Sequence, residues 1–171
     1  MEPGGGGYLA APDAARPDLS SAMAPEIVEI THVQEFAASH RLHNPSWSAE
    51  ENRRVFGICN NENGHGHNWI VEVTVRGTLD GESGMVMDLN RLRVLVLEKL
   101  ISRVDHLHLN HDVPFLRGVN PTAENIARAF WRELEPSLEA NQGCRLHRIR
   151  VRESRFNFVD YWGPTPTQRP S

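Results

Sequence analysis

The sequence of 171 residues has little of what marks several large protein classes. No uninterrupted apolar run exceeds four residues, as at 94–97, whereas a membrane-spanning helix needs about 20. The formal net charge is −4, and Lys and Arg are interspersed with acids, so we expect no basic surface that would attract a phosphate backbone. We therefore expect a protein that neither spans a membrane nor binds nucleic acid.

Cysteine is also scarce, and the beginning of the chain does not resemble a secretion signal. Residues 1–7 lack a positive start and an apolar stretch, so we expect a cytoplasmic location. The only two cysteines are Cys59 and Cys144. In a reducing compartment, cysteines near histidines act more often as ligands or nucleophiles than as a disulfide, so both are predicted to be free thiols. Cys144, in an apparent polar turn, is predicted to be structural or incidental.

The composition predicts one domain between two tails. Residues 1–25 are rich in Gly, Ala, Pro and Ser without periodicity, which indicates a disordered tail. Residues 164–171 carry three prolines and indicate a second disordered tail. The remaining residues, 26–163, have the usual size of a single domain with one core.

Alternating apolar residues predict strands, because side chains on a strand have period two. One extended segment starts at about residue 26, and its inward face should hold Phe36, Ala38, His40 and Leu42. A second one lies near residue 69, and its inward face should hold Trp69, Val71, Val73 and Val75. Two more strands are expected late in the domain, one with Ile149 and Val151 facing inward and one around 156–162.

Capping residues and apolar stripes predict helices between these strands. Ser48 and Glu51 form a capping box for a short helix that Gly57 ends. Two longer helices should begin after Asp88, running to about Arg103, and after Thr122. Their inward positions are Leu89, Leu92, Val96 and Leu100 in one, and Ala123, Ile126, Ala127, Phe130, Trp131 and Leu134 in the other. Strands and helices segregated in this way predict an α+β domain, an antiparallel sheet with two helices on one face.

The histidines carry the strongest chemical signal. His65 and His67 would project from the same face of an extended segment, and His40 lies on the inward face of another. A His pair alone also occurs in loops without metal. Three imidazoles with an open fourth position are, however, a common catalytic zinc arrangement, and without metal each buried ring would need hydrogen-bond partners. The pattern predicts a Zn²⁺ site.

Cys59 lies shortly before the His pair, and three interpretations are open for it. It could be a fourth ligand, a small buried hydrophobe, or a nucleophile or base beside the metal, where the pKa of a thiol falls. Its polar surroundings argue against burial. Asp105-His106 could orient an imidazole for proton transfer, although a solvated loop is the simpler interpretation. A second metal site made of His108, His111 and Asp112 is likewise less favoured than a polar loop.

Glu153 is the other residue of interest. It shares the inward face of Ile149 and Val151, so its carboxylate needs a partner. That partner could be an arginine such as Arg155, or a ligand with an amidine-like pair of N–H groups that a carboxylate binds bidentately.

Several motifs, in this order along the chain, resemble the 6-pyruvoyl-tetrahydropterin synthase family, which includes the bacterial 6-carboxytetrahydropterin synthases of queuosine biosynthesis. The resemblance covers residues 33–163. The matching stretches are FAASHRL (36–42), FGICNN (56–61), GHGHN (64–68), GMVMD (84–88), DH (105–106), PTAEN (121–125) and RE (152–153). Several motifs in the right order are far more specific than any one of them.

The resemblance implies a T-fold (tunnelling fold) whose trimers stack into a homohexamer, a dimer of trimers with active sites between subunits. By position, His40, His65 and His67 would bind zinc and Cys59 would be the catalytic thiol. Glu153 would anchor the pterin, and Thr122 would lie in the pterin pocket. Asp105 and His106 would complete a proton relay that comes from a neighbouring chain.

The implied substrate is 7,8-dihydroneopterin triphosphate. The Cys59-Asn60-Asn61 spacing and the Met85-Val86-Met87 segment look more like the pyruvoyl enzymes, which form 6-pyruvoyl-tetrahydropterin and eliminate triphosphate. Glu62, where those enzymes usually have proline, and the His-rich stretch 106–111 depart from their pattern. The alternative is therefore a 6-carboxy-5,6,7,8-tetrahydropterin synthase acting on the same substrate. Less favoured are a zinc-dependent hydrolase and a non-catalytic metal-binding module.

Overall fold

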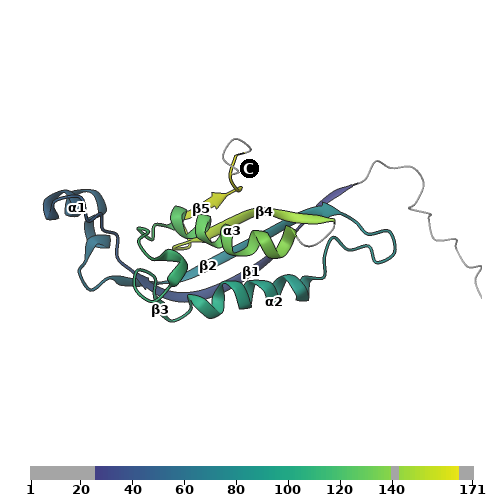
Figure 1. Ribbon diagram of the computed structural model, residues 1–171, viewed down its shortest axis with the longest axis horizontal. Helices are drawn as coiled ribbons and strands as arrows, with labels where there is room; N and C mark the ends of the chain where they lie inside the picture. Colours follow the sequence, from purple (N-terminus) through teal and green to yellow (C-terminus); the bar gives the residue numbers. More distant parts are fainter. Residues whose placement is uncertain (1–25, 140–142, 166–171) are drawn as a thin grey trace, which may run out of the picture.

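The computed structural model of the chain describes residues 26–139 and 143–165 (Figure 1). The predicted tails at 1–25 and 166–171 lie outside the described residues, and 164–165 have no regular secondary structure. The strands and helices are β1 (Ile27–His40), α1 (Ala49–Phe56), β2 (His65–Thr78), α2 (Leu89–Lys99), β3 (Leu107–His108), α3 (Ala123–Glu139), β4 (Cys144–Arg152) and β5 (Phe158–Tyr161).

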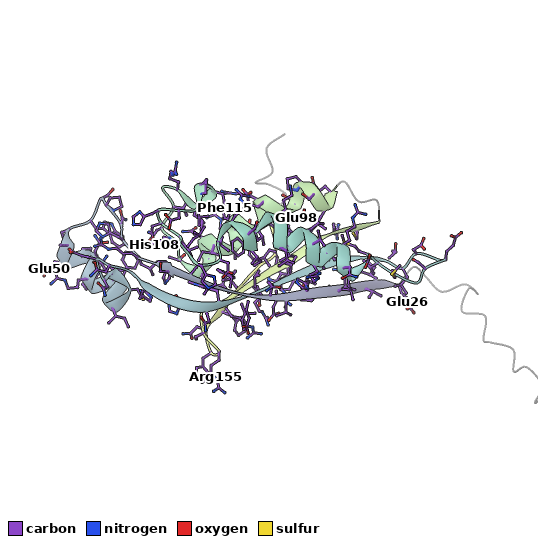
Figure 2. All side chains as sticks on the ribbon, turned by 90° about the horizontal axis from the view of Figure 1, so that it is seen from below. Glu26, Glu50, Glu98, His108, Phe115 and Arg155 are labelled. Atoms are coloured by element: carbon purple, nitrogen blue, oxygen red, sulfur yellow. The ribbon has the colours of Figure 1, made fainter. Side chains whose placement is uncertain are left out.

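The strands form one sheet in the order β3-β1-β2-β4-β5. Neighbouring strands from β1 to β5 are antiparallel, while the two residues of β3 pair with β1 in parallel. The helices α2 and α3 lie on the same face of this sheet, and α1 projects at the end of the molecule opposite Glu26 (Figures 1 and 2). The α+β class is confirmed, with a mixed sheet in place of a purely antiparallel one, because the edge strand β3 pairs with β1 in parallel.

The core lies between the sheet and the helices α2 and α3. On the sheet, the predicted inward residues of β1, β2 and β4 are buried, from Phe36 and Trp69 to Val151. On the helices, the predicted positions are buried except Ala123, which is partly buried, and Leu89, which is 56% exposed. The prediction for Leu89 was wrong: it is the first residue of α2, next to the cap Asp88, and its side chain faces solvent.

The helix boundaries follow local backbone chemistry. The Ser48 side chain accepts a hydrogen bond from the Glu51 amide at 3.1 Å, and Gly57 ends α1 at a φ of +54°, as predicted. The α2 helix ends at Lys99 and not near residue 103: Leu100, with a φ of −117°, is its C-cap, and the chain continues as a 3₁₀ helix over Ile101–Arg103. Among the described residues, no helix is long and apolar enough to cross a membrane.

Both cysteines are free and half-buried. The placement of Cys144 in a polar turn was wrong: it is the first residue of β4 and pairs with Gly77 of β2.

Candidate metal-binding and active site

The register of the first hairpin brings the three predicted histidines together. His40, the last residue of β1, is paired with His65, the first residue of β2, and Ala38 is paired with His67. Because alternate residues share a face, His40, His65 and His67 all project toward the side of the sheet that carries the core. Glu153 follows directly after β4, whose neighbour is β2, and completes the group from a third strand.

The four side chains converge on one point. Each offers one ligand atom, and these atoms lie within 4.8 Å of one another. The Nε2 atoms of His40 and His65 are 3.2 Å apart, and Glu153 Oε1 lies 3.5 Å from Nε2 of His40 and 3.5 Å from Nε2 of His67. His40 is completely buried, whereas the His67 and Glu153 side chains are 25% and 28% exposed. The site is therefore anchored in the core and open on one side.

The hydrogen bonds of His40 fix the state of its ring. Its Nδ1 lies 2.8 Å from the Pro121 carbonyl oxygen, which only accepts, so Nδ1 carries the proton and Nε2 presents a lone pair to the group. Burial lowers the pKa of His40 to about 4, and burial also lowers the pKa of His67. Both rings are therefore neutral near pH 7, which is the form that binds metal.

The polar atoms of the group test whether a metal ion fits here. His67 Nε2 is buried without a hydrogen-bond partner, and so is His65 Nδ1. An unpaired buried polar nitrogen costs about 1–3 kcal/mol. A divalent cation between the rings would give the His67 lone pair a partner and neutralise the charge of Glu153. The His₃ set with an adjacent carboxylate therefore fits such an ion.

Gly64 permits the close approach of the two strands at this end of the sheet. Its φ is +71°, a left-handed conformation, and an added Cβ would lie 2.9 Å from both the His40 carbonyl oxygen and His108 Nε2. Only glycine fits there without moving the backbone that carries His40 and His65.

Cys59 lies in the 3₁₀ turn 57–60 that follows α1, and its carbonyl oxygen accepts a 2.8 Å hydrogen bond from the Leu42 amide. It is half-buried and does not belong to the group of four ligand side chains. Burial raises the pKa of its thiol, and the nearby charge of Glu153 raises it further. A cation in the group would oppose both effects, because it stabilises a nearby thiolate.

Asp105 and His106 form a pair at the other edge of β1. His106 Nδ1 lies 3.0 Å from Asp105 Oδ2, and Asp105 Oδ1 accepts a 2.8 Å hydrogen bond from the Ala37 amide, which lowers the pKa of this carboxyl group. His106 has a φ of +59°, unusual for a residue with a side chain, and its side chain is 81% exposed. The pair is oriented as an acid and its imidazole, but it faces outward and lies outside the metal-binding group.

A cavity of about 520 Å³ opens beside the group and is lined by Glu153 and Thr122 together with Leu42 and Phe56. The Thr122 hydroxyl accepts from the Asn125 amide at 3.4 Å, which leaves its own hydrogen for a ligand. Arg155 is not the partner of Glu153; its guanidinium instead lies 4.8 Å from the centre of the Phe156 ring. The Glu153 carboxylate thus contacts the imidazoles on one side and lines the cavity on the other.

His108, His111 and Asp112 do not form a second group of metal ligands among the described residues. The ring centres of His108 and His111 lie 4.4 Å apart. The Asp112 carboxylate, however, accepts a hydrogen bond from the His108 amide within the same loop. His108 was expected in a loop and instead belongs to the short strand β3.

Sequence reasoning missed two supports of the site. The Pro121 carbonyl fixes the His40 ring, yet a backbone atom 81 residues away leaves no sequence signal. Glu153 was expected to anchor the pterin, and its direct contacts with His40 and His67 had no sequence signal, because they depend on how β2 and β4 are paired.

The chain is similar to known proteins along most of its length. Residues 29–164 match the family model of 6-pyruvoyl tetrahydropterin synthase. A 6-pyruvoyl tetrahydrobiopterin synthase of Poecilia reticulata is 45% identical over 134 residues, which is 78% of this chain and 89% of the relative. The solved structure of the Caenorhabditis elegans 6-pyruvoyl tetrahydropterin synthase superposes with a TM-score of 0.74 at 36% identity, covering 83% of this chain and all of that one.

The other branch of the resemblance is more distant. A putative 6-carboxy-5,6,7,8-tetrahydropterin synthase of Archaeoglobus fulgidus is 38% identical over 96 residues, which is 56% of this chain and 73% of the relative. The match is therefore shorter, at a lower identity, than the match to the Poecilia reticulata protein.

Proposed function

The chain belongs to the 6-pyruvoyl tetrahydropterin synthase family, and from this premise we propose that it converts 7,8-dihydroneopterin triphosphate to 6-pyruvoyl-tetrahydropterin with elimination of triphosphate. The observation that carries the proposal is the convergence of three imidazoles and a carboxylate beside a cavity, together with a cysteine close enough for the charge of Glu153 to act on its thiol. No external redox cofactor is required, because the pterin ring takes up the hydrogens that the side chain gives away.

We assign His40, His65 and His67 as the ligands of a zinc ion. When bound, zinc polarises the hydroxyl groups of the substrate side chain and eases loss of a proton from the adjacent carbon. Cys59 is the base that removes this proton. Burial, and then the charge of Glu153, raise the pKa of the thiol, and a cation held by the histidines would oppose both effects and favour the thiolate.

Glu153 and Thr122 orient the substrate. The carboxylate reaches the cavity on one side and the imidazoles on the other, so a ring anchored there places its side chain next to the metal-binding group. An amidine-like edge of a pterin gives a carboxylate two parallel N–H donors. The contribution of Glu153 is therefore mainly orientation, which decides how well the proton and the thiolate are aligned.

Asp105 and His106 form the proton relay of the active site of a neighbouring chain in a cytoplasmic homohexamer. Two observations support this assignment. The carboxylate is held by the Ala37 amide and contacts the imidazole at 3.0 Å, so the ring is oriented for proton transfer. The His106 side chain is 81% exposed and lies outside the metal-binding group of its own chain. It is therefore accessible to the active site of a neighbouring chain.

The second candidate is the 6-carboxytetrahydropterin synthase reaction on the same substrate. Glu62 and the His-rich stretch 106–111 favour it, because they depart from the pattern of the pyruvoyl enzymes. A zinc-dependent hydrolase would need the same histidines, but its mechanism does not require the Cys59 thiol. A metal-storage module requires neither Cys59 nor Glu153.

The experiment is incubation of zinc-loaded protein with 7,8-dihydroneopterin triphosphate, followed by mass spectrometry of the product. We expect the mass of the pyruvoyl product and release of triphosphate. A Cys59→Ala variant should bind one equivalent of zinc and lose turnover, and Cys144→Ala, which changes the other half-buried thiol, should keep both. Full activity in Cys59→Ala would exclude the thiol as base, and unchanged substrate with folded, zinc-loaded wild type would refute the function.

A further inference from the structure

Arg41 is a half-buried cation without a counter-ion. It directly follows His40 and lines two cavities, of about 600 and 540 Å³, neither of which is lined by Glu153. Among the described residues, no carboxylate forms an ion pair with its guanidinium, whereas Arg148, Arg150 and Arg152 are all paired with acids. A guanidinium that lines a cavity without an ion pair can bind a negatively charged ligand there.

The surrounding residues hold Arg41 in place. The Asn110 side chain accepts from the Arg41 amide at 2.9 Å and donates to its carbonyl oxygen at 2.9 Å. Arg41 Nε donates to the Asn60 carbonyl oxygen at 3.3 Å. The backbone and the base of the guanidinium are therefore fixed, while the two terminal amino groups remain available as a fork, the geometry that binds phosphate oxygens.

His43 adds a hydrogen-bond donor to the two cavities that Arg41 lines. The Asn60 side-chain amide lies 3.1 Å from His43 Nδ1, and an amide NH₂ can only donate, so Nδ1 is the acceptor and the ring proton is on Nε2. His43 lines both cavities together with Arg41. Arg53 of α1 lines the smaller cavity, and no acid pairs with it among the described residues.

We propose that Arg41, His43 and Arg53 form the subsite that binds the triphosphate of the substrate. The assignment rests on the proposed function for the identity of the ligand. Phe56 lines both the Glu153 cavity and the larger Arg41 cavity, so the two cavities share a wall, and Glu153 also belongs to the metal-binding group. A ligand with its ring at Glu153 and its hydroxyls at the imidazoles then has its phosphates on the side of Arg41.

Glu62 provides a charge of opposite sign at the proposed subsite. It is exposed and is the acidic residue that lines both Arg41 cavities. A carboxylate beside bound phosphates repels them, so its removal should act in the opposite direction to removal of a cation. A site that recognises only shape would not respond to these two changes with opposite signs.

The test measures dissociation constants by pterin fluorescence in zinc-loaded Cys59→Ala protein, in which turnover is blocked. Two ligands are compared at fixed ionic strength, 7,8-dihydroneopterin triphosphate and 7,8-dihydroneopterin. Arg41→Gln should weaken binding of the triphosphate about 10-fold to 100-fold, as expected for loss of one charge-assisted contact, and leave the unphosphorylated ligand unchanged. Glu62→Gln should tighten binding of the triphosphate only.

The controls separate local charge from folding. Arg53→Gln, at an exposed position, should weaken the triphosphate alone even if Arg41→Gln fails to fold. Arg54→Gln removes the same charge from the next residue, whose guanidinium is held by Glu51, and should change neither constant. If Arg53→Gln and Arg41→Gln bind both ligands like the parent protein, the subsite is refuted while the proposed function stands.

If neither pterin binds the wild type, the proposed function fails, and calorimetry with inorganic triphosphate decides the subsite alone. Saturable binding that Arg41→Gln abolishes supports it. Binding that is absent, or equal in Arg41→Gln and Arg54→Gln, overturns it.

Discussion

Removal of the metal ion should lower the thermal stability of the protein, and the effect should depend on His67. The ring centres of His40, His65 and His67 lie 4.6–5.1 Å apart, and His67 Nε2 is buried without a hydrogen-bond partner among the described residues. An ion that binds only the folded arrangement stabilises it, because the unfolded chain does not hold the three rings together.

The size of the effect follows from mass action. At a free zinc concentration 100 times the dissociation constant, binding stabilises the folded state by about 2.7 kcal/mol. For a domain of this length the melting temperature shifts by about 2–4 °C per kcal/mol, so chelation should lower it by about 5–10 °C. If His67→Ala weakens binding about 100-fold, the same zinc concentration gives only about 0.4 kcal/mol, a shift of about 1–2 °C.

The assay is differential scanning fluorimetry with zinc and with a chelator, and His147→Ala is the matched control. Its side chain has a similar exposed fraction, 22% against 25% for His67, but it contacts Glu29 on another part of the sheet. His147→Ala should keep the full zinc-dependent shift. The reasoning is refuted if chelation leaves the melting temperature of the wild type unchanged, or if His67→Ala responds to zinc as fully as His147→Ala does.

Two further predictions test the neighbouring residues. Glu153→Gln should keep one equivalent of zinc by metal analysis and raise the KM for the pterin substrate at least about 10-fold, because a neutral amide loses the charge-assisted contact; loss of the zinc would instead make Glu153 a metal ligand. Asn52→Ala should lower the free energy of unfolding by about 2–4 kcal/mol in urea titrations, because Asn52 is completely buried and bonds the backbone of Asn44, Trp47 and Ser48; a loss below about 0.5 kcal/mol would contradict this.

The sequence predicted the elements whose signals are local. The alternation around Phe36 and Trp69 identified the inward faces of β1 and β2, since a two-residue period has one physical meaning in a half-buried sheet. Ser48 and Gly57 located both ends of α1, because a capping side chain and a left-handed glycine act within a few residues. The resemblance to the pterin synthase family supplied the fold name, and the matching relatives bear it out.

Local signals failed where a neighbour in space decided the outcome. Leu89 has the spacing of a core residue, but it is the first residue of α2 and is exposed. Leu107 and His108 carry no strand pattern, and they form β3 because the chain passes along the free edge of β1. Cys144 resembles part of a turn, yet β4 already pairs with β2 at that residue.

For the site, the sequence by itself determined which residue types were available and that His65 and His67 share a face. It also predicted that His40 joins them, whereas the tertiary structure alone decided that Pro121 sets the tautomer of the His40 ring and that Glu153, directly after β4, contacts His40 and His67. The physical reason is that strand register and the packing of distant segments are set by the burial of the whole core. No stretch of a few residues contains that information.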